Sequence, residues 1–297
     1  MTVAKEYVHR AAIAEVFLTG WERTDSDTFR VTAQWPRAHS FYVAEAGLYD
    51  PMLLCETVRQ TFPLLAHAAY DMPLGYALSW SRFQYSVNPQ ELVIRDRPAE
   101  IELRVQCYDI KYQRSVPVRI SMRIDVLRDG QLIAVSETSF GCHSPNVYQR
   151  LRRGRHDAPV AMKTASLVPE SAPPADAGRM RPQDVVIAPT SESDQWQLRV
   201  DTTHPILFDH PLDHAPGMLI LESIRQCAHA AVARAGVNRS IVTGMDITFH
   251  QYIEFDSPCL LRSSADVTTD QASTTVSVEA SQNDGTAFTA LANVLPL

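Results

Sequence analysis

The chain has 297 residues, of which 45% are hydrophobic and 21% are charged, and its formal net charge is -7 at pH 7. This length and apolar content suffice for two globular domains, whereas the negative charge argues against a general nucleic-acid binder. No apolar run approaches the roughly 20 residues that span a bilayer, and the cysteines show no metal-site or disulfide spacing, so we expect a soluble, cytoplasmic protein.

In the first half, residues 27–35 have the pattern of a strand, and residues 51–70 have that of a long apolar helix. Asp50 suits the N-cap of this helix and Pro51 suits its first turn. Residues 116–126 then alternate between apolar and polar side chains, which is the period of a half-buried strand. Asp129-Gly130 follows as a predicted hairpin turn.

A segment rich in Pro and Ala divides the chain. It has neither helical nor strand period and reads as an extended linker. We therefore predict a first domain over 1–155, a linker over 156–180 and a second domain over 181–297.

The second half repeats the order of the first. A strand is expected over 195–203, a long helix over 217–235 and a hairpin turn at Asp284-Gly285. A long helix followed by antiparallel strands predicts an α+β fold in which each half wraps a sheet around a central helix. Pairing the sheets of the two halves would give an intrachain pseudo-dimer and remove exposed sheet edges.

The same motif occurs in both helices, 166 residues apart: Leu54-Cys55-Glu56-Thr57-Val58-Arg59-Gln60 and Ile220-Leu221-Glu222-Ser223-Ile224-Arg225-Gln226. A Glu and an Arg three residues apart share one face of a helix. Charged groups are costly to bury, so a repeated pair in an apolar helix indicates function, although a structural ion pair is the alternative. Burial raises the pKa of such a carboxyl and a nearby arginine lowers it, and the sequence leaves this balance open.

The loop before the second helix is rich in His and Asp: His204, Asp209, His210, Asp213 and His214. Proline breaks the segment and no cysteine joins it, so we expect no metal ion here and no cofactor in the protein. A histidine in this loop could bond to the backbone or transfer protons next to the helix start.

The second helix begins at Pro216-Gly217-Met218, where free N–H groups could hold an oxyanion. In the first helix Pro51 lacks the N–H that Gly217 has, which favours the second start as the oxyanion site. A separate basic cluster, Arg150, Arg152, Arg153 and Arg155, could dock an acidic partner protein.

The second motif resembles the hotdog motif of the A-factor biosynthesis family, the γ-butyrolactone and butenolide synthases. The resemblance lies in residues 208–222 and, in the first half, in residues 15–21, 34–39 and 56–60. It covers nearly the whole chain apart from the linker. A looser similarity links the second motif to hotdog dehydratases.

The resemblance implies tandem hotdog folds and an acyltransferase. The expected reaction moves a β-ketoacyl group from an acyl carrier protein or CoA thioester to a hydroxyl of dihydroxyacetone phosphate, and ring closure then gives a butenolide. Carried onto this chain, it implies important roles for Glu56, Glu222 and Arg225, to which we add His210 as a catalytic base. The expected substrate-binding residues are Arg59, His39, Gly217, Met218 and His214. The basic cluster would receive the carrier protein.

Two other interpretations stay open at this point: a hotdog dehydratase or thioesterase acting on acyl thioesters, and a non-catalytic protein that binds acyl ligands. Neither the acyl chain length nor the final product class follows from the sequence. We also expect the repeated Glu and Arg side chains to point into a shared, largely dry crevice between the two halves.

Overall fold

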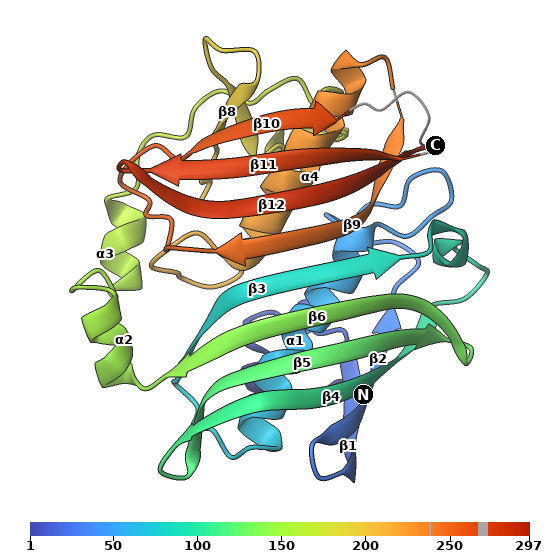
Figure 1. Cartoon of the computed structure of the whole chain (residues 1–297), viewed down its shortest axis with the longest axis vertical. Helices are drawn as coiled ribbons and strands as arrows, with labels where there is room; N and C mark the ends of the chain where they lie inside the picture. Colours follow the sequence, from blue (N-terminus) through green and yellow to red (C-terminus); the bar gives the residue numbers. More distant parts are fainter. Residues whose placement is uncertain (238, 267–272) are drawn as a thin grey trace. The chain divides into compact units, whose positions relative to one another are not determined.

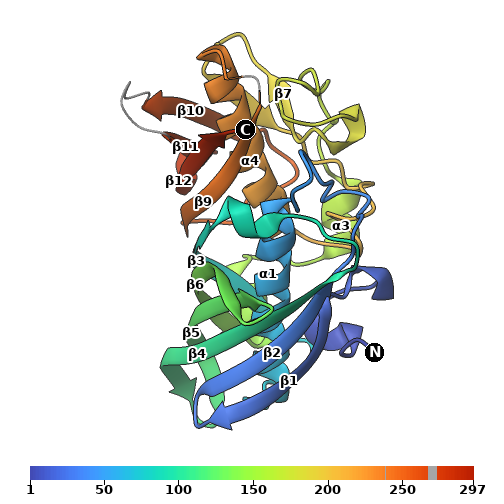
Figure 2. The ribbon, with the colours of Figure 1, turned by 90° about the vertical axis from the view of Figure 1, so that its right-hand side faces the viewer.

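The computed structural model describes residues 1–237, 239–266 and 273–297. It consists of two compact units, Met1–Arg153 and Gly154–Leu297. Each unit is an antiparallel sheet that curves around one long helix (Figures 1 and 2). This confirms the prediction of two consecutive sheets, each wrapped around a central helix.

Unit 1 contains the helix α1 and a sheet with the strand order β1-β2-β4-β5-β6-β3. Its elements are η1 (Lys5–Val8), η2 (Ile13–Glu15), β1 (Leu18–Asp25), β2 (Thr28–Trp35), α1 (Pro51–Ala68), β3 (Ala77–Val87), η3 (Pro89–Leu92), β4 (Ala99–Gln113), β5 (Val116–Arg128), β6 (Gln131–His143) and α2 (Pro145–Leu151).

Unit 2 contains the helix α4 and a sheet with the order β7-β8-β10-β11-β12-β9, the same topology as in unit 1. Its elements are α3 (Ala158–Lys163), η4 (Pro182–Asp184), β7 (Ile187–Pro189), β8 (Gln195–Leu198), α4 (Gly217–Arg234), β9 (Ser240–Phe249), β10 (Leu260–Asp266), β11 (Thr274–Gln282) and β12 (Gly285–Pro296).

The two central helices are buried on nearly every side. In α1 the apolar side chains of Leu54, Val58 and Leu65 are inaccessible to solvent, and in α4 Leu221 and Ile224 are equally buried. Each such side chain contributes about 1.5–3 kcal/mol to folding through its removal from water. A helix that is apolar all round is stable only when it is enclosed, and the curved sheet encloses it.

The start of α1 follows the sequence prediction. The Asp50 carboxylate accepts a hydrogen bond from the N–H of Met52 at 2.8 Å, and Pro51 occupies the first turn. This cap satisfies one of the N–H groups that every helix leaves unpaired at its start. It fixes where α1 begins and therefore where Glu56 lies.

One predicted turn is displaced by one residue. The hairpin between β5 and β6 does use Asp129 and Gly130, both with positive φ. Between β11 and β12, however, the residues with positive φ are Asn283 and Asp284, and Gly285 opens β12. Asn and Asp tolerate this conformation, and a Cβ on Gly285 would lie 3.0 Å from the side chain of Gln251. The absence of a side chain at Gly285 therefore leaves space for the side chain of Gln251.

The segment expected to be an extended linker has more structure than its composition suggests. It includes α3, whose start is capped by the Asp157 carboxylate, and it buries Ala172 and Ala177. The N–H of Ala172 donates to the carbonyl of Ile187 at 3.0 Å. This segment is thus packed against unit 2, and the prediction that it forms an extended linker misses these contacts.

Candidate functional site

The repeated carboxylates lie at matching places in the two units. Glu56 is in the second turn of α1 and Glu222 is in the second turn of α4, and both side chains are completely buried. A lone buried carboxylate would be strongly destabilising, so each must be paired. The pairing partners define the site.

In unit 2, Glu222 is held by two arginines and a glutamine. Oε1 of Glu222 lies 2.9 Å from Nε of Arg179, 2.5 Å from Nη2 of Arg225 and 2.5 Å from the amide nitrogen of Gln226. Oε2 of Glu222 lies 3.0 Å from Nε of Arg225 and 2.8 Å from Nη2 of Arg179. Arg225 therefore donates to the carboxylate from two nitrogens, the geometry that guanidinium groups favour, while Arg179 donates from Nε and keeps Nη2 within ion-pair distance.

Unit 1 contains the same cluster. Glu56 is held by Arg10, whose Nε and Nη2 lie 2.9 and 2.7 Å from Oε1. Arg59 donates to both oxygens of Glu56, and the amide nitrogen of Gln60 donates to Oε1 at 2.7 Å. The expected i, i+3 pair is thus present twice, and each copy recruits a further arginine from outside the helix.

These contacts settle the opposing effects on the carboxyl groups. Burial alone would raise the pKa of Glu56 and Glu222, but Arg10 and Arg59, or Arg179 and Arg225, lower it to about 2. Both carboxylates are therefore ionised at neutral pH and are weak bases. Chemically, they can position and balance guanidinium groups far better than they can accept a proton from a substrate.

The glutamine of each motif ties the helix to the segment that supplies the extra arginine. The side-chain oxygen of Gln226 accepts from the N–H of Val186 at 2.8 Å, and its amide nitrogen donates to the carbonyl of Asp184 at 2.8 Å. Gln60 makes the same two bonds with Phe17 and Glu15 in unit 1. Helix and segment are therefore locked in one register in both units.

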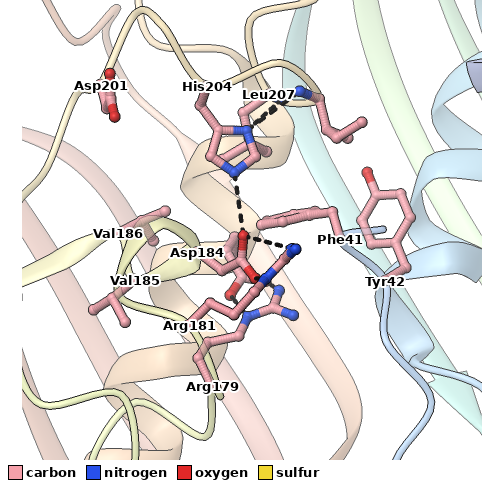
Figure 3. A network of polar contacts seen from close by, with 12 residues as sticks. Phe41, Tyr42, Arg179, Arg181, Asp184, Val185, Val186, Asp201, His204 and Leu207 are labelled. Carbon is pink, nitrogen blue, oxygen red and sulfur yellow. Dashed lines mark hydrogen bonds and ion pairs between the residues drawn. The ribbon is translucent and has the colours of Figure 1, made fainter. Parts of the chain in front are cut away.

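A histidine adjoins each cluster. Nδ1 of His204 accepts from the N–H groups of Ile206 and Leu207, and its Nε2 lies 3.8 Å from Oδ1 of Asp184, as Figure 3 shows. Burial lowers the pKa of His204 below its usual range, so the ring is mainly neutral. Its ring fixes the loop that leads toward α4, which is the backbone-binding role considered for a histidine of this loop.

His39 occupies the corresponding place in unit 1. Its Nδ1 accepts from the N–H groups of Phe41 and Tyr42, and its Nε2 lies 3.3 Å from the carboxylate of Glu15. Both ring nitrogens thus face groups of the chain itself. Substrate binding by His39 stays a prediction.

The loop before α4 holds two pairs of Asp and His. Nδ1 of His210 lies 2.5 Å from Oδ1 of Asp209, and Nδ1 of His214 lies 2.7 Å from Oδ1 of Asp213. The side chain of Asp209 is buried, whereas that of His210 is 36% exposed. A carboxylate that accepts from Nδ1–H leaves Nε2 as the basic nitrogen, which is the arrangement of a general base.

The starts of the two helices differ as expected. Pro216 stands at the N-cap of α4, the position that Asp50 occupies in α1, and it provides no side-chain cap. Within the described residues, no protein acceptor is recorded for the N–H groups of Gly217 and Met218. These donors, at the positive end of the helix dipole, can stabilise a negative oxygen.

The basic cluster is only partly available to a partner. Arg150 and Arg153 are exposed, but Arg152 is buried. Arg155 is exposed too, yet its guanidinium pairs with the carboxylate of Asp256 at 2.9 Å. Two of the expected docking residues are therefore engaged by the chain itself.

Within residues 1–237, 239–266 and 273–297, no three His, Cys, Asp or Glu side chains gather closely enough to hold a metal ion. In the same residues, no helix is both long and apolar enough to cross a membrane. The free cysteines are all buried, as core residues are.

Comparison with known proteins decides the family. The sequence profile of the A-factor biosynthesis hotdog domain matches residues 1–144 and 160–296. The chain belongs to the A-factor biosynthesis hotdog family. It is 41% identical to a Streptomyces virginiae protein named 2-oxo-3-(phosphooxy)propyl 3-oxoalkanoate synthase, with 98% of this chain and 96% of that protein covered. A Streptomyces griseus protein of the same name is 37% identical, with 96% and 93% covered.

Among solved structures, a candidate oleoyl thioesterase from Lactobacillus plantarum aligns with a TM-score of 0.56 and 10% identity. The alignment covers 92% of this chain and 98% of that chain. At this identity the likeness concerns the fold alone. It agrees with the tandem hotdog architecture of the A-factor biosynthesis family.

In this family member the sequence pattern did not identify Arg10 and Arg179 as parts of the site. A signal was available. Arg10 precedes Glu15 by five residues and Arg179 precedes Asp184 by five, and a Val follows each acid. This second repeat lies at an offset of 169 residues, three more than the 166-residue offset of the helices.

Proposed function

We propose that this protein transfers a 3-oxoacyl group from a thioester to a hydroxyl of dihydroxyacetone phosphate. The relatives that cover nearly the whole chain are named as synthases of 2-oxo-3-(phosphooxy)propyl 3-oxoalkanoate, which is the ester of these two components. That similarity over both units is the observation that carries the proposal. The expected donor is an acyl carrier protein or CoA thioester.

The chemistry is a direct exchange of ester for thioester. The hydroxyl oxygen attacks the acyl carbonyl carbon, the C–S bond breaks, and the hydroxyl proton reaches the departing thiolate. A thioester is electrophilic enough that no acyl-enzyme is needed. The resulting ester carries an acidic CH2 between two carbonyls, and attack of this carbon on the triose ketone, followed by loss of water, gives a butenolide.

His210 is the proposed base for the attacking hydroxyl. The carboxylate of the adjacent Asp209 accepts a hydrogen bond from Nδ1–H, and the ring is partly open to solvent. A positioned base of this kind contributes about 10²- to 10⁴-fold to a rate. His214, which has the same arrangement with Asp213, is the proposed substrate-binding neighbour.

The first turn of α4 is the proposed oxyanion site. When the hydroxyl attacks, the acyl carbonyl oxygen becomes negative, and the N–H groups of Gly217 and Met218 can donate to it. Donors fixed by a helix need no reorganisation as this charge develops. The capped start of α1 is less suited to the task, which favours unit 2 as the working site.

Glu222 and Arg225 have a proposed joint role. The buried carboxylate holds the Arg225 guanidinium, which would bind the 1,3-dicarbonyl of the acyl group. Glu222 is then a positioning residue for Arg225, because its low pKa makes it a poor base. Glu56 and Arg59 would do the same in unit 1 if that unit binds part of the substrate.

For the carrier protein, the exposed Arg150 and Arg153 at the end of α2 are the proposed contacts. Carrier proteins that deliver acyl chains would meet them through acidic side chains. Arg152 and Arg155 are less suitable for the reasons given above.

The test is incubation of the purified protein with a 3-oxoacyl thioester and dihydroxyacetone phosphate, followed by mass spectrometry. We expect a phosphate-bearing ester or butenolide. Free 3-oxo acid in amounts that do not depend on the triose would instead indicate a thioesterase, and loss of water from a 3-hydroxyacyl thioester would indicate a dehydratase. Binding of the thioester without any turnover would favour an acyl-ligand binder.

A further inference from the structure

The two buried clusters correspond residue by residue with one exception. Gln60 and Gln226 mark the register, because each bonds to the backbone of an acid and of the residue two positions after it. Five residues before these acids, Arg10 corresponds to Arg179, and three residues before them, Ala12 corresponds to Arg181. Unit 2 thus has an arginine where unit 1 has a methyl group.

This difference changes the charge of the cluster. The corresponding groups in unit 1 are two arginines and two carboxylates: Arg10 and Arg59 pair with Glu56, and the carboxylate of Glu15 lies 3.3 Å from Nε2 of His39. In unit 2, three arginines face two carboxylates. The cluster in unit 2 therefore carries one formal positive charge more than its counterpart.

Arg199 and Asp201 lie near the unit 2 cluster but leave this surplus unchanged. Arg199 donates to the carbonyls of Pro169 and Val185. Asp201 acts on Arg199 with the opposite charge. The pair is neutral as a whole.

Of the three arginines, Arg181 is the accessible one. The side chains of Arg179 and Arg225 are nearly buried against Glu222, whereas that of Arg181 is 45% exposed. Its guanidinium is also held in place. Nε and Nη2 of Arg181 lie 2.7 and 3.1 Å from the two oxygens of the buried Asp184 (Figure 3).

We propose that Arg181 binds the phosphate of the acyl acceptor in unit 2. A phosphate monoester carries a charge of about -1.5 to -2 at neutral pH and accepts forked hydrogen bonds from a guanidinium. An arginine preorganised by Asp184 loses little side-chain entropy when it binds. The assignment rests on the proposed function and adds the residue that distinguishes a phosphorylated triose from an unphosphorylated one.

The test compares two acceptors in one variant. With dihydroxyacetone phosphate, Arg181→Ala should lower kcat/KM by about 10- to 100-fold, the loss expected for a hydrogen bond to a charged group. With dihydroxyacetone, which has no phosphate, the same variant should keep the wild-type rate. With dihydroxyacetone phosphate, kcat/KM of Arg181→Lys should lie between the values of the wild type and of Arg181→Ala. Lysine keeps the positive charge but cannot make the forked hydrogen bond.

Arg262→Ala is the matched control. Arg262 lies in unit 2, is 57% exposed and pairs with Glu192 at 2.7 Å and Asp194 at 3.3 Å. It should behave as the wild type with both acceptors. Surface ion pairs of this kind contribute little to stability, so the control separates a general loss of surface charge from a specific contact.

Calorimetric titration with dihydroxyacetone phosphate gives a readout that does not require turnover, and Arg181→Ala should weaken binding by about tenfold or more. Equal losses on both acceptors would assign Arg181 a structural role and overturn the proposal, as would unchanged kinetics and binding. If the wild type makes no ester from either acceptor, the proposed function fails, and the titration alone then decides whether Arg181 binds the phosphate.

Discussion

Nε and Nη2 of Arg179 lie 2.9 and 2.8 Å from the two carboxylate oxygens of Glu222, in a place where neither side chain has appreciable contact with water. Arg179 comes from the segment before the sheet of unit 2, and Glu222 from its central helix. In unit 1, Arg10 pairs with Glu56 in the corresponding place, with Nε and Nη2 2.9 and 2.7 Å from Oε1. The fork therefore joins segment to helix in both halves of the duplicated chain.

Arg179→Met should lower the free energy of unfolding by about 3 kcal/mol, because it removes one partner of a buried ion pair. Arg10→Met should have an effect of similar size. Urea denaturation of the wild type and both variants checks this. Arg30→Ala is the control, because Arg30 pairs with Glu22 on the surface. This substitution should lower the free energy of unfolding by less than about 1 kcal/mol. A loss as small for Arg179 as for Arg30 would contradict the structural role of the fork.

Pro216→Asp transfers the cap of α1 to α4. The new carboxylate should accept from the N–H of Met218, as Asp50 accepts from Met52, and stabilise the protein by about 1 kcal/mol. It would also occupy the proposed oxyanion site, so the rate of ester formation should fall by about 10²-fold. Steady-state kinetics and thermal unfolding measure the two effects.

Pro216→Ala removes the proline without adding a carboxylate and serves as the control for that variant. It should keep most of the activity. Comparable activity in the Asp and Ala variants would mean that the start of α4 takes no part in the reaction.

His210→Gln should lower kcat by about 10²-fold or more, since it removes the proposed base. Asp209→Asn should lower kcat as well, because the neutral amide lacks the negative charge that stabilises the imidazolium formed when His210 takes up a proton. Rates of ester formation under saturating substrate test both changes. His250→Gln is the comparison: His250 is exposed on unit 2 and bonds to Thr289, and its replacement should leave kcat intact. Wild-type kcat in His210→Gln would remove this residue from the mechanism.

Acid should destabilise the protein in two steps. Burial lowers the pKa of His229 to about 3, and Gly178 packs against its ring so closely that an added Cβ would lie 3.0 Å away. The unfolded chain takes up this proton near pH 6.5, so stability falls as the pH drops from about 6.5 toward 3. Glu56 and Glu222 have a pKa of about 2 in the folded protein, so the unfolded chain takes up their protons first as the pH falls. Stability therefore decreases further between about pH 4.5 and 2.

Replacing the buried histidine separates these steps. His229→Gln should weaken the dependence of stability on pH between about 6.5 and 4.5. It should keep the part that comes from the other buried histidines, such as His204, and the steeper fall below that range. Denaturation midpoints measured across this range give the answer. A wild-type slope in the variant would mean that another group takes up the proton.

The sequence predicted those elements that depend on local patterns. The apolar helices, the cap at Asp50 and the alternating strand over 116–126 all follow from spacing and from residues that are neighbours in the chain. The turn at Asp284-Gly285 was misplaced because Gly285 serves a contact with Gln251, and a turn motif contains no information about such a distant neighbour.

The buried Glu–Arg clusters were predicted only where they lie on the helices. Each Glu–Arg pair lies within one turn of its own helix, Glu56 and Arg59 in α1 and Glu222 and Arg225 in α4. The pairing therefore follows from the helical period. Arg10 and Arg179 approach from irregular segments, and no local pattern predicts which helix side chain they reach. The low pKa of Glu222 could not be anticipated for the same reason, since Arg179 causes much of it.

The most direct test of the proposed reaction follows the oxygen of the attacking hydroxyl. Dihydroxyacetone phosphate labelled with oxygen-18 at its free hydroxyl is incubated with a 3-oxoacyl thioester and the enzyme, and the product is read by mass spectrometry. Transfer to the hydroxyl predicts that the label is retained in the bridging oxygen of the ester. A product that contains only unlabelled oxygen at this position, or only free 3-oxo acid, would contradict the account.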